Sequence, residues 1–354
     1  MKIIHTGDLH LCSPLTSRLS AEKAKKRGRE IEESFAALCE RGYELGASAF
    51  IIAGDLFDSE RISARSLETV LAVIARHSGM DFFYLAGNHE GNALKERAKV
   101  LPANLKLFGG GWTYYDLDGV RISGRRETAS DMFSALELGK EKNIVILHGE
   151  LRDKTREGGI IGLSDFDKLN IDYMALGHYH TYSVRQFGRG AAVYAGTPEG
   201  RGFDETGEKG FCLIDTDGER VTHRFIPSAK RKLLIEEIDI SDAETTADIW
   251  GLIEKRISGI GRENILRVLL TGRRKPELII NRDIISSEYG RVFFYFEIKD
   301  ETKLAVCPDD YRFDKSLKGE FIRLCFAEES LSEEERDKII ECGIAALSGE
   351  AYDE

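Results

Sequence analysis

The stretch that decides the fold is Ile3-Ile4-His5-Thr6-Gly7-Asp8-Leu9-His10. Its apolar residues predict a buried strand, and its glycine predicts a turn that presents a carboxylate and an imidazole two residues apart. An Asp-x-His pair alone is a weak signal, because such pairs occur by chance in a chain of 354 residues. It gains weight because four further polar pieces follow, each after an apolar run: Gly54-Asp55-Leu56-Phe57-Asp58, Gly87-Asn88-His89-Glu90, His148-Gly149 and Gly177-His178-Tyr179-His180.

The segments between the first three pieces alternate between strand and helix. The pattern predicts strands at 2–5, 49–52 and 82–85, with helices at 20–45 and 62–77 between them. Strand–helix repeats predict a sheet covered by helices, and open α/β sheets place their sites just after the strands. Candidate ligands at these positions are therefore expected to lie close together.

The next part of the chain changes to shorter strands. Alternating strands are expected over 105–124, and buried strands at 144–147 and 173–176 deliver His148 and His178. Residues 182–226 are typical of meandering strands. The first domain is therefore predicted to be an α/β protein, a mixed-sheet sandwich with α/β edges.

A domain boundary is predicted near Pro227-Ser228, where the pattern restarts. We expect three parts: a first domain at 1–228, a small α+β domain at 229–327, and an acidic C-terminal helix and tail at 328–354. Ser332 and Glu335 have the spacing of a capping box at the start of that helix. The expected elements of the small domain are strands at 233–240, 265–271 and 291–298, with a helix at 243–258.

The composition is that of an ordinary globular protein, with 42% hydrophobic and 31% charged residues. No apolar run is long enough to cross a bilayer, and the N-terminus has no signal-peptide pattern, so no membrane partner is expected. The cysteines are scattered and form no CxxC pair. Reduced thiols in a cytoplasmic protein are the expected reading.

The net charge of −11 is concentrated at the C-terminus, where residues 328–354 carry ten acidic and two basic residues. That segment contributes −8, so the rest of the chain sums to only −3. Basic clusters also occur, although any single cluster is more often a solvated face than a DNA site. Charge therefore leaves a nucleic-acid partner open.

The polar pieces together contain ligands for two metal ions. Carboxylate, amide and imidazole groups suit hard divalent cations, and Asp55 is the natural bridge between two ions about 3.5–4 Å apart. Asp55 is expected to share the first metal with Asp8, His10 and His180, and the second with Asn88, His148 and His178.

Two such ions lower the pKa of a bridging water and spread the charge that grows during in-line displacement at phosphorus, so a bridging hydroxide is the expected nucleophile. His89 cannot easily share a metal with Asn88, because neighbouring loop residues point apart. We expect His89 to bind the phosphate or protonate the leaving oxygen, and Asp58 to act with it as its carboxylate partner.

These residues resemble the calcineurin-like metallophosphoesterase superfamily, whose pattern is D-x-H, G-D-x-x-D, G-N-H-[DE], H and G-H-x-H. Every element is present over roughly residues 1–226. The first two pieces are similar to those of SbcD-type DNA double-strand-break nucleases. Residues 194–205 (YAGTPEGRGFDE) and 318–324 (KGEFIRL) resemble the YhaO-type branch of DNA repair exonucleases.

The resemblance implies a four-layer α/β/β/α sandwich, a C-terminal capping domain, two Mn²⁺ ions and a nuclease acting on DNA ends. It also implies a coiled-coil SbcC-type ATPase as partner, with the acidic C-terminal helix as a candidate contact, and it allows a homodimer. The chain departs from the family pattern at Ala195, where proline is usual, and at Glu90, where aspartate is commoner.

Three functions remain open from the sequence. The first is a Mn²⁺-dependent DNA exonuclease or endonuclease in DNA repair. The second is a small-molecule or cyclic-nucleotide phosphodiesterase of the same superfamily, and the third is a non-catalytic subunit that binds DNA or an ATPase. Cys12, which follows His10 closely, is either an ordinary loop cysteine or an oxidation-sensitive thiol.

Overall fold

The computed structural model describes residues 1–14, 19–154, 158–275 and 278–347. The chain divides into two compact units, Met1–Leu233 and Leu234–Glu354. None of the helices in the described part of the chain has the length and apolar character needed to span a bilayer.

The first sheet of the N-terminal unit has the strand order β14-β13-β1-β2-β3-β4. Strands β1 to β4 are parallel, and β13 runs antiparallel to β1 and to β14. The strands are β1 (Lys2–Thr6), β2 (Ala47–Ala53), β3 (Asp81–Leu85), β4 (Leu105–Leu107), β13 (Gly210–Asp215) and β14 (Thr222–Pro227).

The second sheet has the order β11-β12-β10-β7-β6-β5, with the four inner strands parallel and the two edge strands antiparallel to their neighbours. Its strands are β5 (Thr113–Leu117), β6 (Val120–Gly124), β7 (Lys142–His148), β10 (Tyr173–Gly177), β11 (Ser183–Phe187) and β12 (Gly190–Tyr194). A separate two-stranded sheet is formed by β8 (Glu150–Arg152) and β9 (Ile160–Gly162).

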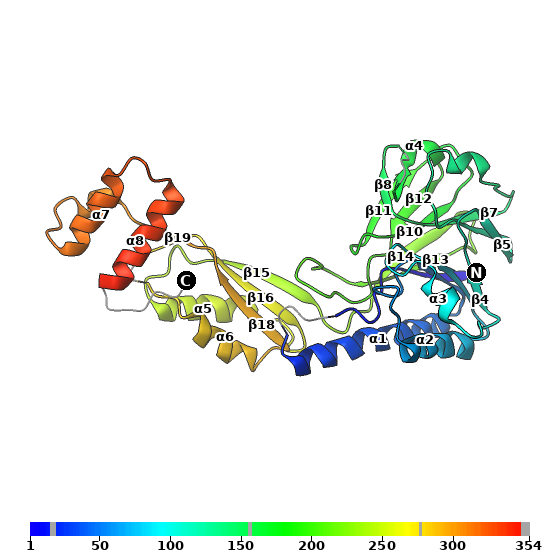
Figure 1. Ribbon diagram of the computed structural model, residues 1–354, viewed down its shortest axis with the longest axis horizontal. Helices are drawn as coiled ribbons and strands as arrows, with labels where there is room; N and C mark the ends of the chain where they lie inside the picture. Colours follow the sequence, from blue (N-terminus) through cyan, green and yellow to red (C-terminus); the bar gives the residue numbers. More distant parts are fainter. Residues whose placement is uncertain (15–18, 155–157, 276–277, 348–354) are drawn as a thin grey trace. The chain divides into compact units, whose positions relative to one another are not determined.

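The two large sheets pack face to face (Figure 1). Successive strand residues point to opposite faces, so Ile3 and Ile51 pack between the sheets while Ile4 and Phe50 pack on the outer side. Helices α1 (Ala21–Glu44) and α2 (Ala64–Arg76) cover that outer side. The other sheet is covered by the 3₁₀ helix η1 (Met132–Ala135) and α4 (Leu163–Phe166), and the short α3 (Ala93–Arg97) follows β3.

This arrangement confirms the predicted four-layer α/β/β/α sandwich. It follows from strands that are apolar on both faces, which must be covered on both sides.

The predicted start of α1 is also confirmed, because the Ser20 side chain accepts a hydrogen bond from the Lys23 backbone N–H and so caps the helix.

The C-terminal unit contains a three-stranded sheet, β15-β16-β18, with α5 and α6 packed on one hydrophobic core. The Ser332–Glu335 capping box is confirmed at the start of α8. The strand predicted at 291–298 instead spans 295–300, because α6 continues to Gly290 and a turn follows it. The elements are β15 (Leu233–Asp239), α5 (Thr246–Ile257), β16 (Ile265–Thr271), β17 (Arg273–Arg274), α6 (Arg282–Gly290), β18 (Tyr295–Asp300), β19 (Lys303–Leu304), η2 (Pro308–Tyr311), α7 (Leu317–Ala327) and α8 (Glu333–Leu347).

Buried ion pairs connect α1 with the end of the N-terminal unit. The Arg231 guanidinium donates to both carboxylate oxygens of Glu30, at 2.7 and 2.5 Å. Arg27, also buried, lies 3.5 Å from Glu30 and 2.7 Å from Glu199. Glu199 in turn accepts a hydrogen bond from the Lys230 backbone N–H at 2.7 Å. Glu30 therefore neutralises two arginines that have almost no access to water.

Replacing Glu30 with alanine is expected to destabilise the N-terminal unit by about 3 kcal/mol, because the substitution removes the carboxylate that pairs with the buried Arg231 and leaves Arg27 with Glu199 alone. The matched control is Glu33→Ala, which removes an exposed glutamate from the same helix and is expected to change stability by less than about 0.5 kcal/mol. Denaturant unfolding of the three proteins measures the difference. Equal midpoints for Glu30→Ala and Glu33→Ala would contradict the role of Glu30 as a shared counter-charge.

Candidate metal centre

The candidate ligands lie at the carboxyl ends of strands from both large sheets. Asp8, Asp55 and Asn88 follow β1, β2 and β3, whereas His148 ends β7 and His178 follows β10. Two hydrogen bonds join these ends: the Asp8 backbone N–H donates to the Gly54 carbonyl at 3.0 Å, and His148 Nδ1 lies 2.9 Å from the Ala53 carbonyl oxygen. The polar residues at the strand ends of the two sheets thus lie close together.

The backbone at this place is strained. Asp8, His10 and Asp55 have φ values of 52°, 47° and 47°, and His178 has a φ of 108°. Non-glycine residues rarely adopt such angles, and each costs on the order of 1–3 kcal/mol. Local strain of this kind is concentrated at functional sites, where the surrounding fold holds side chains in a geometry that the free chain avoids.

Two motif glycines are required by close approach. A Cβ atom on Gly54 would lie 2.1 Å from His148 Nδ1, and one on Gly87 would lie 2.1 Å from Asp55 Oδ1. Neither contact is possible for a side chain larger than hydrogen. The glycines of the second and third sequence pieces therefore make room for the imidazole and carboxylate of the centre.

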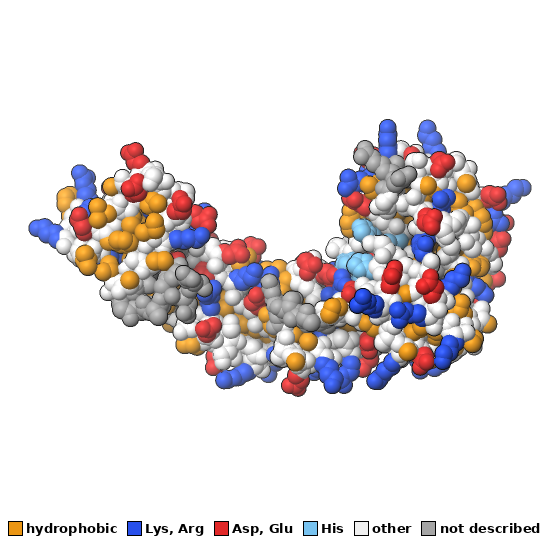
Figure 2. Space-filling view, in the orientation of Figure 1, with side chains coloured by type: hydrophobic (Ala, Val, Ile, Leu, Met, Phe, Trp, Pro, Cys, Tyr) orange, Lys and Arg blue, Asp and Glu red, His pale blue; other side chains and the backbone are white. Residues whose placement is uncertain are grey.

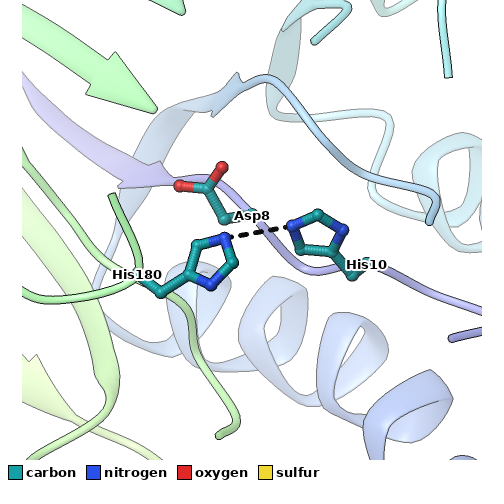
Figure 3. A group of neighbouring side chains, drawn as sticks. All are labelled: Asp8, His10 and His180. Carbon is teal, nitrogen blue, oxygen red and sulfur yellow. Dashed lines mark hydrogen bonds between the residues drawn. The ribbon is translucent and has the colours of Figure 1, made fainter. Parts of the chain in front are cut away.

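One group of possible ligands consists of Asp8, His10 and His180. One ligand atom from each residue lies within 4.8 Å of the others. The Nε2 atoms of the two histidines are 3.2 Å apart and face each other beside the Asp8 carboxylate (Figure 3). Asp8 and His10 are buried and His180 is partly exposed, so the group opens to solvent on the His180 side.

A second group is centred on Asp55 and His148. His148 Nε2 lies 3.3 Å from Asp55 Oδ2 and 2.8 Å from Asn88 Oδ1. Asp55 Oδ2 is also 3.9 Å from His10 Nε2, a member of the first group. Its role as a bridging ligand stays a prediction.

The His178 ring packs beside that of His148. Its ring centroid is 5.5 Å from that of His148, and its backbone N–H donates to both Asp8 carboxylate oxygens at 2.9 and 3.0 Å. Among the described residues, the three-residue clusters of possible ligand atoms do not include His178. Its role as a ligand stays a prediction.

The electrostatics of the centre follow from burial and charge pairing. Burial raises the pKa of Asp8 to about 7. Burial also pushes the pKa of Asp55 upward, but the hydrogen bond and positive charge of His148 outweigh it, and the net shift is downward. The same carboxylates raise the pKa of His148 despite the burial of its imidazole. A proton and a cation therefore compete for His148 Nε2.

The donor set fits hard divalent cations. Two buried carboxylates, an amide oxygen and imidazole nitrogens converge, and oxygen with imidazole nitrogen suits ions such as Mn²⁺. The identity of the ion as Mn²⁺ is a prediction. Burying two carboxylates this close to each other is costly unless positive charge is supplied, which a bound cation would do.

His89 lies beside both groups, and 46% of its side chain is exposed to solvent. Its ring centroid is 4.8 Å from that of His10. Its Nδ1 lies 3.2 Å from the Asp58 backbone carbonyl, and ligand atoms of His10, Asp58 and His89 all lie within 4.8 Å of one another. The pairing of the Asp58 carboxylate with His89 stays a prediction. That carboxylate also lies 3.1 Å from His10 Nδ1 and 3.0 Å from the Arg201 guanidinium.

Glu205 and Arg201 are site residues that the sequence pattern alone did not reveal. Glu205 Oε1 lies 2.7 Å from His180 Nδ1, and Arg201 donates to the same oxygen at 2.9 Å. The buried Lys209 donates to the His180 carbonyl at 2.6 Å. Glu205 therefore fixes the tautomer in which the lone pair of His180 Nε2 faces the centre. The only sequence signal was the run of charged residues in 194–205.

Glu90 fixes the two loops of the first sheet relative to each other. Its buried carboxylate accepts hydrogen bonds from the backbone N–H groups of Phe57, at 2.5 Å, and Gly87, at 3.2 Å. One loop carries Asp55 and the other carries Asn88. The longer glutamate that replaces the usual aspartate thus has defined partners.

Fold and centre together define a hydrolase of phosphate esters that depends on divalent metal. The family comparison gives the same class: the model of the calcineurin-like phosphoesterases matches residues 1–201, and the chain belongs to this family. This confirms the resemblance drawn from the five sequence pieces.

The individual relatives share about a quarter of their residues with this chain or fewer. The DNA double-strand break repair protein Mre11 of Sulfurisphaera tokodaii is 25% identical over 333 residues, covering 85% of this chain and 81% of that protein. The uncharacterized metallophosphoesterase YhaO of Bacillus subtilis is 24% identical, covering 79% and 74%. A dimetal phosphatase from Danio rerio is a solved structure with a TM-score of 0.44 and 13% identity, covering 63% of this chain and 95% of its own.

Replacing Glu205 with glutamine is expected to weaken the binding of one equivalent of Mn²⁺ by roughly 10- to 100-fold, because a carboxylate that orients a ligating histidine contributes about that factor. Calorimetric titration of the metal-free protein measures it. Glu208→Gln is the matched control, since Glu208 is an exposed neighbour that pairs with Lys232. Unchanged affinity in Glu205→Gln would show that Glu205 does not support a metal ligand.

Proposed function

We propose that this protein is a nuclease of DNA repair that hydrolyses DNA phosphodiester bonds with two divalent cations, Mn²⁺ being the expected ion. The observation that carries the proposal is the position of Asp55, whose Oδ2 lies 3.3 Å from His148 Nε2 and 3.9 Å from His10 Nε2. The first ion would be held by Asp8, His10, His180 and Asp55. The second would be held by Asp55, Asn88, His148 and His178.

The proposed chemistry divides between the ions and the chain. When bound, two such cations lower the pKa of water and stabilise charge on the phosphoryl oxygens. His89 is exposed next to His10, so it can reach the ester and hydrogen-bond the phosphate or protonate the leaving oxygen. Asp58, held by Arg201, positions the His89 ring through its backbone carbonyl.

Support for DNA as the substrate comes from relatives named as DNA double-strand break repair proteins, which align with most of this chain. A groove of about 960 Å³ opens at Asn88, His148 and His178 and can accept a nucleotide chain end. The exonuclease and endonuclease activities are both compatible with an open groove.

One observation favours the alternative, a phosphodiesterase acting on small molecules or cyclic nucleotides. The side chains that line the groove include four glutamates, Glu60, Glu96, Glu127 and Glu150, but only the two arginines Arg97 and Arg126. Such a wall repels the further phosphates of a long polyanion.

A protein partner is also proposed. Phe313, Leu317 and Leu324 are exposed on and beside α7, and Figure 2 shows hydrophobic side chains gathered over this part of the C-terminal unit. Apolar residues on a helix surface suit a coiled-coil partner of the SbcC-type ATPase kind. The acidic α8 is the predicted contact, and the alternatives of a solvated tail and of a homodimer stay predictions.

A cytoplasmic location is proposed from the state of the cysteines. All six, each within the described residues, are free thiols. Free thiols are expected in a reducing compartment. Cys12 is exposed, with its Sγ 3.9 Å from Glu32, and burial of part of the side chain raises its pKa, which disfavours a reactive thiolate.

His89→Ala is expected to lower kcat by roughly 10²–10⁴-fold, because a positioned acid is lost, and to keep both metal equivalents. Metal analysis and steady-state turnover measure the two effects. His223→Ala, which removes a half-buried imidazole in β14, is the control and is expected to retain turnover. Loss of a metal ion from His89→Ala would contradict the assigned role.

The substrate is tested by offering the Mn²⁺-loaded protein linear duplex DNA, single-stranded DNA and bis-p-nitrophenyl phosphate. We expect all three to be cleaved by the wild type and none by His89→Ala at a comparable rate. Cleavage of the small ester alone would favour the small-molecule phosphodiesterase. Absence of any cleavage would favour a non-catalytic subunit that binds DNA or an ATPase.

A further inference from the structure

Tyr179 is an aromatic residue placed between two candidate ligands, His178 and His180, and its side chain is 41% exposed. Tyr194, which contacts it, is the buried member of the pair, at 4% exposed. Of the two rings, only that of Tyr179 is accessible to a ligand from solvent.

The Tyr179 ring packs against two other rings. It meets the Tyr194 ring edge to face, with centroids 4.8 Å apart at 62°, and its centroid is 5.5 Å from that of His178. Partial burial and the nearby Glu150 carboxylate raise the pKa of its hydroxyl, and Arg152 Nη2 lies 2.9 Å from that carboxylate. The ring is thus fixed in place before any ligand arrives.

Tyr194 makes this support rigid. Its hydroxyl donates to the Gly149 carbonyl at 2.7 Å and accepts from the Leu151 backbone N–H at 2.8 Å. These residues directly follow His148, so the same segment carries a candidate ligand and the support of the ring. A binding surface ordered in advance loses little conformational entropy when a ligand binds.

We propose that Tyr179 is the stacking surface of a nucleobase subsite, which takes the base next to the phosphate held at the metal centre. The inference rests on the proposed function, because it places the scissile phosphate beside His178. The ring lies one side chain away from that position, and a base is joined to its phosphate by one sugar. A fixed, exposed aromatic ring at this distance suits the flat face of a base.

Charge at the subsite agrees with a base rather than with a second phosphate. The Glu150 carboxylate lies at the hydroxyl end of the ring, where it would repel an anion. A carboxylate is instead an acceptor for the amino groups of cytosine, adenine or guanine. The preferred substrate is therefore a nucleotide ester that carries its base, in a single strand or a splayed end where the base is free to stack.

The inference is tested with two single-stranded oligonucleotides of equal length, one carrying abasic sites at its terminal positions. The Mn²⁺-loaded wild type is compared with Tyr179→Ala, with Tyr179→Phe, which keeps the ring, and with Tyr43→Ala, which removes an exposed tyrosine from α1. Both kcat/KM and the affinity for phosphorothioate versions of each oligonucleotide are measured, together with bound Mn²⁺.

Tyr179→Ala is expected to lower kcat/KM and affinity for the base-bearing oligonucleotide by roughly tenfold or more, and to leave the abasic one and the Mn²⁺ content unchanged. Tyr179→Phe and Tyr43→Ala are expected to match the wild type. An equal loss on both oligonucleotides, or no loss on either, would overturn the subsite. If the wild type cleaves bis-p-nitrophenyl phosphate but neither oligonucleotide, the proposed DNA substrate fails and the subsite fails with it.

Discussion

The rest of this structure depends on one electrostatic constraint, which is that two carboxylates are buried within a few ångströms of each other. Asp8 and Asp55 are both almost inaccessible to water, and like charges at such a distance disfavour ionisation of both. Imidazole groups, backbone N–H groups and, as we propose, two cations offset this negative charge. The His178 backbone N–H donates to Asp8, and the His89 backbone N–H donates to Asp55 at 3.0 Å. The backbones of the loops that carry His178 and His89 are therefore held in place by the Asp8 and Asp55 carboxylates.

The same constraint explains why two sheets are needed. A single parallel sheet presents its loops along one edge, whereas the ligands of this centre come from the ends of β1, β2 and β3 in one sheet and of β7 and β10 in the other. Convergence requires tight turns, which the left-handed angles at Asp8, His10 and Asp55 supply. The cost of this strain is offset by the large core between the sheets, in which Ile3, Ile51 and Ile146 are fully buried. Stability in the sandwich thus permits strain at the centre.

Much of the fold and of the centre could be predicted because it depends on local pattern. Apolar runs followed by glycine and a polar residue mark strand ends, and strand ends of parallel sheets meet, so the grouping of Asp8, His10 and His180 follows from sequence. The partners of Asp58 could not be predicted in this way. Its carboxylate contacts Arg201, which lies 143 residues away, and only the tertiary fold brings them together. The contact of Glu205 with His180 could not be predicted for the same reason. The early start predicted for β18 has a local cause, since the turn after α6 contains the apolar residues Val292 and Phe293, which match a strand pattern.

Charge alone does not identify a nucleic acid as the substrate of this protein. The groove beside the centre is lined with more glutamates than arginines, and the whole chain carries −11. Two bound divalent cations would add four positive charges beside that groove, and this would draw one phosphate to the centre without attracting the phosphates that follow it. Recognition of a nucleotide would then need a contact with its base that does not depend on charge. An aromatic ring that is fixed by Tyr194 and exposed on its free side can make such a contact, because stacking is insensitive to the acidic wall around it. In this view the centre holds the ester, and the tyrosine distinguishes nucleotide esters from the rest.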